Sequence, residues 1–134
     1  GYVAAPQILS PLTEAMASLQ QYTFVCAPHP FQKAAVTALD CDLTQYIDDY
    51  RIKRDLIFNG LKDHFELFKP SGAFYAFVKA PGGDATAFVE KAIKNNVLII
   101  PGYVFSQKNS HFRISFAISN PQIKKGIQRL LALI

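Results

Sequence analysis

The sequence has little of what marks a secreted, membrane-spanning or metal-binding protein. Its 134 residues include no tryptophan, one methionine and two cysteines, and Cys26 and Cys41 lack the spacing of metal ligands. Uninterrupted apolar runs such as 97–100 are far shorter than the roughly 20 residues of a membrane-spanning helix. No basic leader followed by an apolar stretch opens the chain. We therefore expect reduced thiols, no metal, no membrane segment and a cytoplasmic location.

An excess of one charge is also lacking. Fourteen Lys and Arg against ten Asp and Glu give a net charge of +4, and no basic run is longer than Lys124-Lys125. A nucleic-acid partner is therefore not expected. The histidines, His29, His64 and His111, are far apart in sequence and lie in no nucleophile or ligand motif. We accordingly assign no catalytic residue to the chain.

What the sequence does contain is enough apolar side chains for a core. Half of the residues are hydrophobic and 18% are charged, as in a globular domain. Helical periodicity predicts helices at about 10–21, 31–39, 44–64, 84–96 and 120–134. Alternation or continuous apolar runs predict strands at 2–5, 65–68, 73–79, 97–100 (buried on both faces) and 112–118. This order predicts an α/β (α+β) fold in two layers, with a small mixed or antiparallel sheet packed against helices.

Arg113 is the one charged residue in an otherwise apolar and small-residue strand. It lies on the polar side of that strand, where a guanidinium needs an anionic partner. Its planar fork can hold a carboxylate through two parallel hydrogen bonds. Two interpretations are open: an arginine at the sheet edge that pairs with a local Asp or Glu, and an arginine that binds the carboxylate of a ligand.

Five segments, taken in order, resemble the C-terminal part of class I/II pyridoxal-phosphate aminotransferases, which are fold-type I enzymes of the aspartate aminotransferase superfamily. The segments are GYVAAP at 1–6, QYTF at 21–24 with Pro28 and Gln32, KPSGAFY at 69–75, IPGYVFS at 100–106 and HFRISFA at 111–117. The resemblance covers essentially the whole chain in order and spacing. It implies that 29–134 is the C-terminal small domain of such an enzyme, and that 1–28 is the trailing edge of its large domain and an interface loop.

The resemblance also implies roles for particular residues. In the family, the arginine of the R-x-S/T-[FY]-A strand binds the α-carboxylate of the substrate, and Arg113 is the matching residue. The aromatic residue of the S-G-A-F-Y stretch lines the substrate side of the pocket and corresponds to Phe74. Thr23, in a hydrophobic loop from Tyr22 to Pro28, corresponds to the hydroxyl that approaches the cofactor phosphate of the neighbouring subunit in the homodimer. The alternatives are core packing for Phe74 and a hydrogen bond to its own backbone for Thr23.

The implied activity moves an amino group between an amino acid and a 2-oxo acid through pyridoxal phosphate. In the family, the Schiff-base lysine and the residues that hold the pyridine ring precede this region, so the chain alone is expected to be inactive and without bound cofactor. Pro101-Gly102 is expected to position a loop at the active-site entrance, and Ser106 replaces a common glycine there, which leaves the amino-acid donor open. Alternatives are a lyase or a regulator that shares this domain, and a stand-alone module that binds amino acids or mediates dimerisation.

Overall fold

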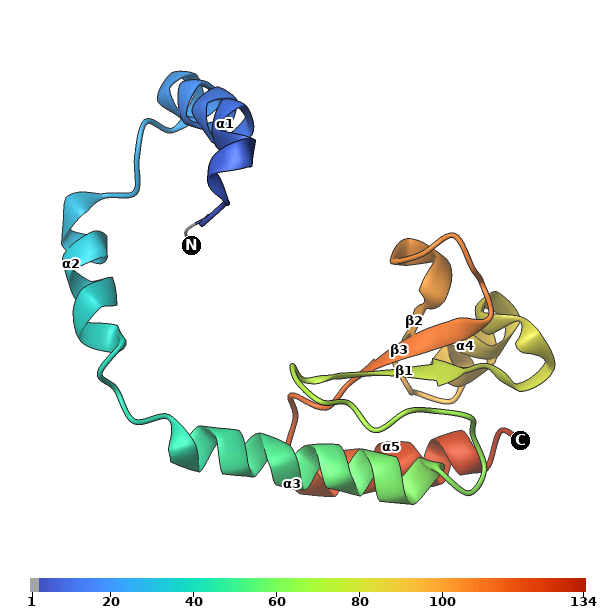
Figure 1. Ribbon diagram of the computed structural model, residues 1–134. Helices are drawn as coiled ribbons and strands as arrows, with labels where there is room; N and C mark the ends of the chain where they lie inside the picture. The colour runs from blue at the N-terminus through green and yellow to red at the C-terminus, as the bar shows by residue number, and fades with distance from the viewer. Residues whose placement is uncertain (1–2) are drawn as a thin grey trace. The chain divides into compact units, whose positions relative to one another are not determined.

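The computed structural model describes residues 3–134 (Figure 1). Residues 3–5 are irregular, so the strand expected at 2–5 is wrong where the chain is described, and Tyr2 lies outside the described residues. The chain forms two compact units, residues 1–42 and residues 43–134. The division predicted after residue 28 concerns the parent domains of an enzyme and stays a prediction. Within residues 3–134, no helix has the length and apolar character needed to cross a bilayer.

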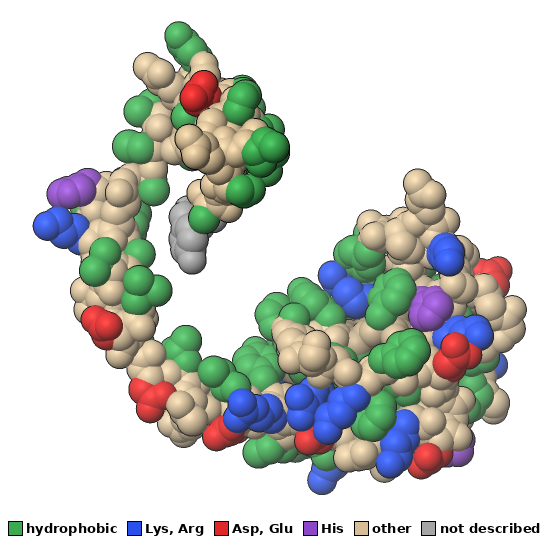
Figure 2. Space-filling view, in the orientation of Figure 1, with side chains coloured by type: hydrophobic (Ala, Val, Ile, Leu, Met, Phe, Trp, Pro, Cys, Tyr) green, Lys and Arg blue, Asp and Glu red, His purple; other side chains and the backbone are tan. Residues whose placement is uncertain are grey.

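The first unit consists of two helices without a core of their own. Helix α1 (Ser10–Thr23) follows a short helical turn, and α2 is His29–Ala38. The predicted helix start at residue 10 is confirmed, and the Ser10 hydroxyl donates to the Gln7 carbonyl at 2.7 Å in the preceding turn. Neither helix has a buried residue, and Figure 2 shows hydrophobic side chains spread over the surface of α1.

The second unit combines three helices with a small antiparallel sheet, which confirms the predicted fold class. The helices are α3 (Thr44–Leu61), α4 (Ala85–Lys94) and α5 (Asn120–Leu131), and the strands are β1 (Tyr75–Lys79), β2 (Ile100–Pro101) and β3 (His111–Ser115). The strand order is β1-β3-β2, and both pairs are antiparallel. Because β3 is the central strand, the sheet-edge position considered for Arg113 is wrong.

Three further predicted strands differ from the observed ones. Residues 65–68 contribute an isolated bridge between Leu67 and Val78 and a hydrogen bond from the Lys79 N–H to the Glu66 carbonyl at 3.0 Å, and Pro70, which has no N–H to donate, follows two residues later. Residues 97–99 are outside the sheet, because the Val97 N–H still closes the end of α4 on the Ala92 carbonyl at 2.9 Å. Leu98 is 86% exposed, so this segment is not buried on both faces. The strand predicted to reach residue 118 ends at 115.

The helices cover one face of the sheet and leave the other open. Alternate strand residues on the covered face, Ala76, Val78, Phe112 and Ile114, are buried in the core. The rings of Phe65, Phe88 and Phe112 meet there, with centroids 5.0 to 6.1 Å apart. Helices α3 and α5 lie side by side (Figure 1) and approach closely at Gly60, where a Cβ would lie 2.8 Å from the Ile127 Cδ1 atom. The arrangement is the predicted two-layer architecture, and it places Arg113 on the open face.

Helix α4 is capped by Asp84, the first residue of the helix predicted at 84–96. The Asp84 carboxylate accepts hydrogen bonds from the backbone N–H groups of Thr86 (3.0 Å) and Ala87 (3.2 Å). The same oxygen accepts from the Asn109 side chain at 3.0 Å. This cap therefore also anchors the segment that leads into β3.

Candidate functional site

Arg113 lies between two aromatic rings on the open face of the sheet. Its guanidinium carbon is 4.1 Å from the centroid of the Tyr75 ring and 4.0 Å from the centroid of the Phe105 ring. Among the described residues, no carboxylate or other hydrogen-bond acceptor pairs with the guanidinium of Arg113. The interpretation of Arg113 as one half of a local ion pair is therefore wrong.

Strand register and a turn bring these two rings to Arg113. Phe77 is the residue directly opposite Arg113, and Tyr75 lies two residues along β1 as a diagonal neighbour on the same face. On the other side, Ile100 of β2 pairs with Arg113. The chain then turns through η3 (Gly102–Val104), which returns Phe105 to the arginine.

The turn that carries Phe105 is closed by hydrogen bonds to one carbonyl. The backbone N–H groups of Phe105 and Ser106 both donate to the Gly102 oxygen at 2.9 Å. The Ser106 hydroxyl accepts from the Lys108 N–H at 3.2 Å and lies 3.1 Å from the Lys108 carbonyl oxygen, to which it can donate. The serine that replaces the family glycine thus holds the turn in place.

Gly102→Ala is expected to destabilise the chain by about 1–3 kcal/mol. A Cβ at residue 102 would lie 2.4 Å from the backbone oxygen of His111, which belongs to the central strand. Urea unfolding followed by circular dichroism measures the change. Gly126→Ala in α5 is the matched control, because its Cβ would meet nothing within 4 Å and alanine favours a helix by about 0.5–1 kcal/mol over glycine. Equal stability of the two variants would contradict the tight packing at Gly102.

Phe74 lies outside the core, beside the Tyr75 ring that contacts Arg113. It is 38% exposed, so the core-packing alternative is wrong. Its ring is 4.4 Å from the Tyr75 ring and 6.0 Å from the Tyr50 ring, measured between centroids. Phe74 also lines a groove of about 350 Å³ between the first half of α3 and the 71–74 segment. Tyr75 therefore contacts both predicted substrate residues, Arg113 and Phe74, while the substrate role of each stays a prediction.

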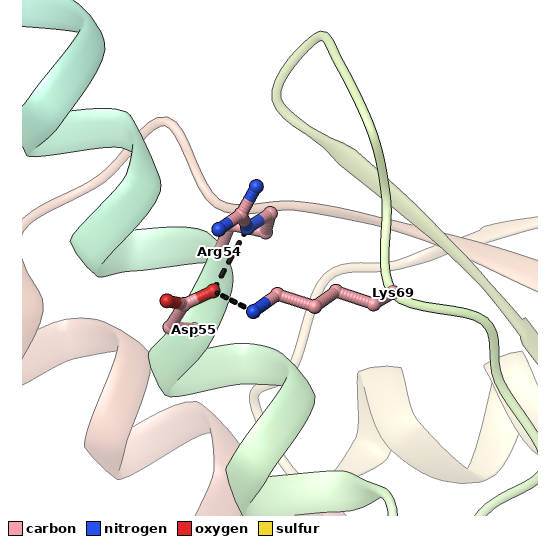
Figure 3. A network of polar contacts seen from close by, with 3 residues as sticks. All are labelled: Arg54, Asp55 and Lys69. Carbon is pink, nitrogen blue, oxygen red and sulfur yellow. Dashed lines mark hydrogen bonds and ion pairs between the residues drawn. The ribbon is translucent and has the colours of Figure 1, made fainter.

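An ion-pair network fastens the start of the KPSGAFY segment to α3 (Figure 3). The Asp55 carboxylate accepts from the Lys69 Nζ at 2.9 Å and from the Arg54 Nε at 2.8 Å. These two hydrogen bonds and the two positive charges lower the pKa of Asp55 to about 2. The network therefore anchors Lys69, the first residue of the short loop that leads to Phe74 and Tyr75.

The Asp55 carboxyl is expected to titrate near pH 2, as followed by NMR of its side-chain carbon. The pKa of Asp55 in the fold is below the ordinary value of 3.8, so the stabilisation by its ion pairs is fully present above pH 3.8. This contribution is lost as the pH falls through about 2. Lys69→Met removes one cation and should raise the pKa. Lys62→Met, which removes a lysine outside this network, is the control. An unchanged Asp55 titration in Lys69→Met would contradict the assigned cause.

Thr23 lies in a helix, whereas the sequence predicts that it lies in a loop. It is the last residue of α1 rather than part of a loop, and its hydroxyl lies 3.0 Å from the Leu19 carbonyl and 3.2 Å from the Gln20 carbonyl, which accept its proton. The hydrogen bond to its own backbone, the stated alternative, is therefore present. Thr23 belongs to the first unit and Arg113 to the second.

Tyr75 and Phe105 are the contacts that sequence reasoning missed. Tyr75 belongs to the KPSGAFY motif and Phe105 to the IPGYVFS motif. Neither stands out from the other aromatic residues of its motif as a candidate contact of Arg113. The available signal was the strand period of two, which places Tyr75 and Phe77 on one face of β1. Phe105 offered no such signal, since a turn brings it to Arg113.

Comparisons with known proteins agree on one family. The family model described as aminotransferase class I and II matches residues 1–130. A probable aspartate aminotransferase of Methanocaldococcus jannaschii is 35% identical over 95% of this chain and 36% of its own length. The crystal structure of an aspartate aminotransferase from Thermotoga maritima matches 90% of this chain and 32% of its own, with 28% identity and a TM-score of 0.80. An aromatic aminotransferase from Pyrococcus horikoshii matches 98% of this chain and 39% of its own, with 26% identity and a TM-score of 0.83. The chain thus spans about a third of the length of the relatives it matches.

Proposed function

Because the chain belongs to the class I and II aminotransferase family, we propose that it forms the carboxylate-binding side of an enzyme that moves an amino group between an amino acid and a 2-oxo acid. The observation that carries this proposal is the guanidinium of Arg113, which is flanked by two rings and has no acidic partner within residues 3–134. A charged group in this position favours an anionic ligand from solution.

One arginine can serve both halves of the proposed reaction. An amino acid and a 2-oxo acid share a carboxylate next to the reacting carbon, so the same guanidinium fork can orient either molecule. Two parallel hydrogen bonds fix the rotation of the carboxylate as well as its position. Orientation of the reacting carbon is a major source of rate enhancement.

The cofactor of this proposal is pyridoxal phosphate, which supplies the electron sink when bound. The residue that the resemblance assigns to its phosphate does not fit that group as the first unit is folded. Thr23, the residue assigned to the phosphate, directs its proton to its own helix. It also lies in the last turn of α1, where the carbonyl ends of the helix disfavour an anion. The chain's own contribution is therefore to place the substrate, and we propose that the chain alone is inactive.

The proposal includes a homodimer in the cytoplasm, with 1–28 at the large-domain boundary and 29–134 as the small domain. The segment from Tyr22 to Pro28 supports the interface role, because its large apolar side chains lack a core. Tyr22 is 84% exposed, and Phe24 and Val25 are each 67% exposed. Apolar exposure of this kind is typical of surfaces that another subunit covers.

The experiment is an amino-transfer assay of the full-length gene product, loaded with pyridoxal phosphate and supplied with 2-oxoglutarate. Aspartate is the first donor and aromatic amino acids are the next, since named relatives act on these classes. Transfer that requires a 2-oxo acid acceptor supports the proposal. Product formation without an acceptor would indicate a lyase instead, and the absence of any reaction with every donor would contradict an enzymatic role.

A further inference from the structure

We propose that Tyr75 and Phe105 are positioning residues that clamp the guanidinium of Arg113 between their rings and so fix the direction of its N–H donors. This inference rests on the proposed function, because it concerns how Arg113 is held for a carboxylate. The family resemblance assigned no role to either residue.

The geometry places the two rings on different sides of the ion. The guanidinium carbon lies over each ring face, 4.1 Å from one centroid and 4.0 Å from the other. Within residues 3–134, the Tyr75 ring makes a ring–ring contact with Phe74 and none with Phe105. The guanidinium is therefore flanked from both sides.

A ring that stacks on the face of a guanidinium leaves the edge of that group free for hydrogen bonding. All five of its N–H donors lie in the plane of the group, so rings over its faces block none of them. Each ring also attracts the cation through its π face. An arginine side chain loses much rotamer freedom when it becomes ordered, and ordering before the substrate arrives removes that cost from binding. The clamp thus prepares Arg113 for a carboxylate in one orientation.

The two halves of the clamp are held by separate elements. Tyr75 is fixed by the β1–β3 pairing, in which it lies opposite Ser115. Phe105 is fixed by its backbone hydrogen bond to Gly102 and by the neighbouring Ser106. Phe77 offers a matched control on the same face: it lies opposite Arg113, yet its ring stacks on His111 with centroids 5.2 Å apart.

The test measures carboxylate affinity in the full-length gene product loaded with pyridoxal phosphate. Succinate and 3-phenylpropionate are the probes, because each has a carboxylate and neither has an amino or oxo group to transfer. Tyr75→Leu and Phe105→Leu keep apolar bulk but remove the π face, and each is expected to raise the Kd and the KM by about three- to thirtyfold, with a smaller effect on kcat. Tyr75→Phe and Phe77→Leu should stay within about twofold of the parent protein. Full affinity in Tyr75→Leu would overturn the clamp.

A double-mutant cycle separates a clamp from a merely structural role. In an Arg113→Ala background, Tyr75→Leu should cause no further loss of affinity, because the group it positions is gone. An undiminished effect of Tyr75→Leu in that background would overturn the proposal. If the parent protein transfers amino groups but Tyr75→Leu binds both probes equally well, the clamp alone fails. If the parent protein neither transfers amino groups nor binds either probe, the proposed function itself fails.

Discussion

Arg113→Lys in the full-length gene product is expected to lower kcat/KM for amino transfer by about ten- to a hundredfold. Lysine keeps the positive charge but lacks the planar fork, so the carboxylate loses one of two charge-assisted hydrogen bonds, each worth about 1.5–3 kcal/mol. Rotation of the less constrained substrate would reduce kcat further. Steady-state kinetics with the best donor, together with thermal melting of the same variant, measure both effects.

Folding should change little in Arg113→Lys, and this separates substrate binding from a structural role. Arg113 is partly exposed and makes no ion pair within residues 3–134, so its replacement breaks no buried polar network. Arg129→Lys is the control, because that partly exposed arginine donates to the Asn96 carbonyl at 2.9 Å in a different part of the surface. A normal kcat/KM in Arg113→Lys would rule out the carboxylate anchor, and a large fall in melting temperature would indicate a structural role.

Phe112→Ala is expected to lower the free energy of unfolding of the chain by about 3–5 kcal/mol. Phe112 is fully buried on the central strand, and its ring centroid lies 5.0 Å from that of Phe88 and 6.1 Å from that of Phe65. Removal of the ring leaves a cavity and breaks both aromatic contacts. Because a domain is stable by only about 5–15 kcal/mol in total, the loss is a large fraction of it. Urea unfolding followed by circular dichroism measures the change.

Phe68→Ala is the matched control for this core prediction. Phe68 was expected in a strand, but it is 88% exposed, so its removal should change stability by less than about 0.5 kcal/mol. Similar losses in the two variants would contradict the assignment of Phe112 to the core and of Phe68 to the surface.

The sequence by itself determined the fold class, most helices and the one arginine that we propose binds a carboxylate. Local chemistry sufficed for these features: the Asp84 side chain caps α4 through its own neighbours, and apolar periodicity defines the faces of α3 and α5. Arg113 stood out because a charge in an apolar strand needs an explanation. The family resemblance then connected it with a carboxylate, and the family model matches residues 1–130.

Only the tertiary structure decided which strands form and what surrounds Arg113. Residues 65–68 and 97–99 are rich in apolar side chains, yet a strand exists only where a partner supplies a ladder of hydrogen bonds, and neither segment has one. Tyr75 reaches Arg113 through the register between β1 and β3, and Phe105 reaches it through the η3 turn. These contacts join residues 38 and 8 positions from Arg113 in the sequence. Pairing across such separations depends on the whole fold, whereas a cap or a helical face depends on residues a few positions apart.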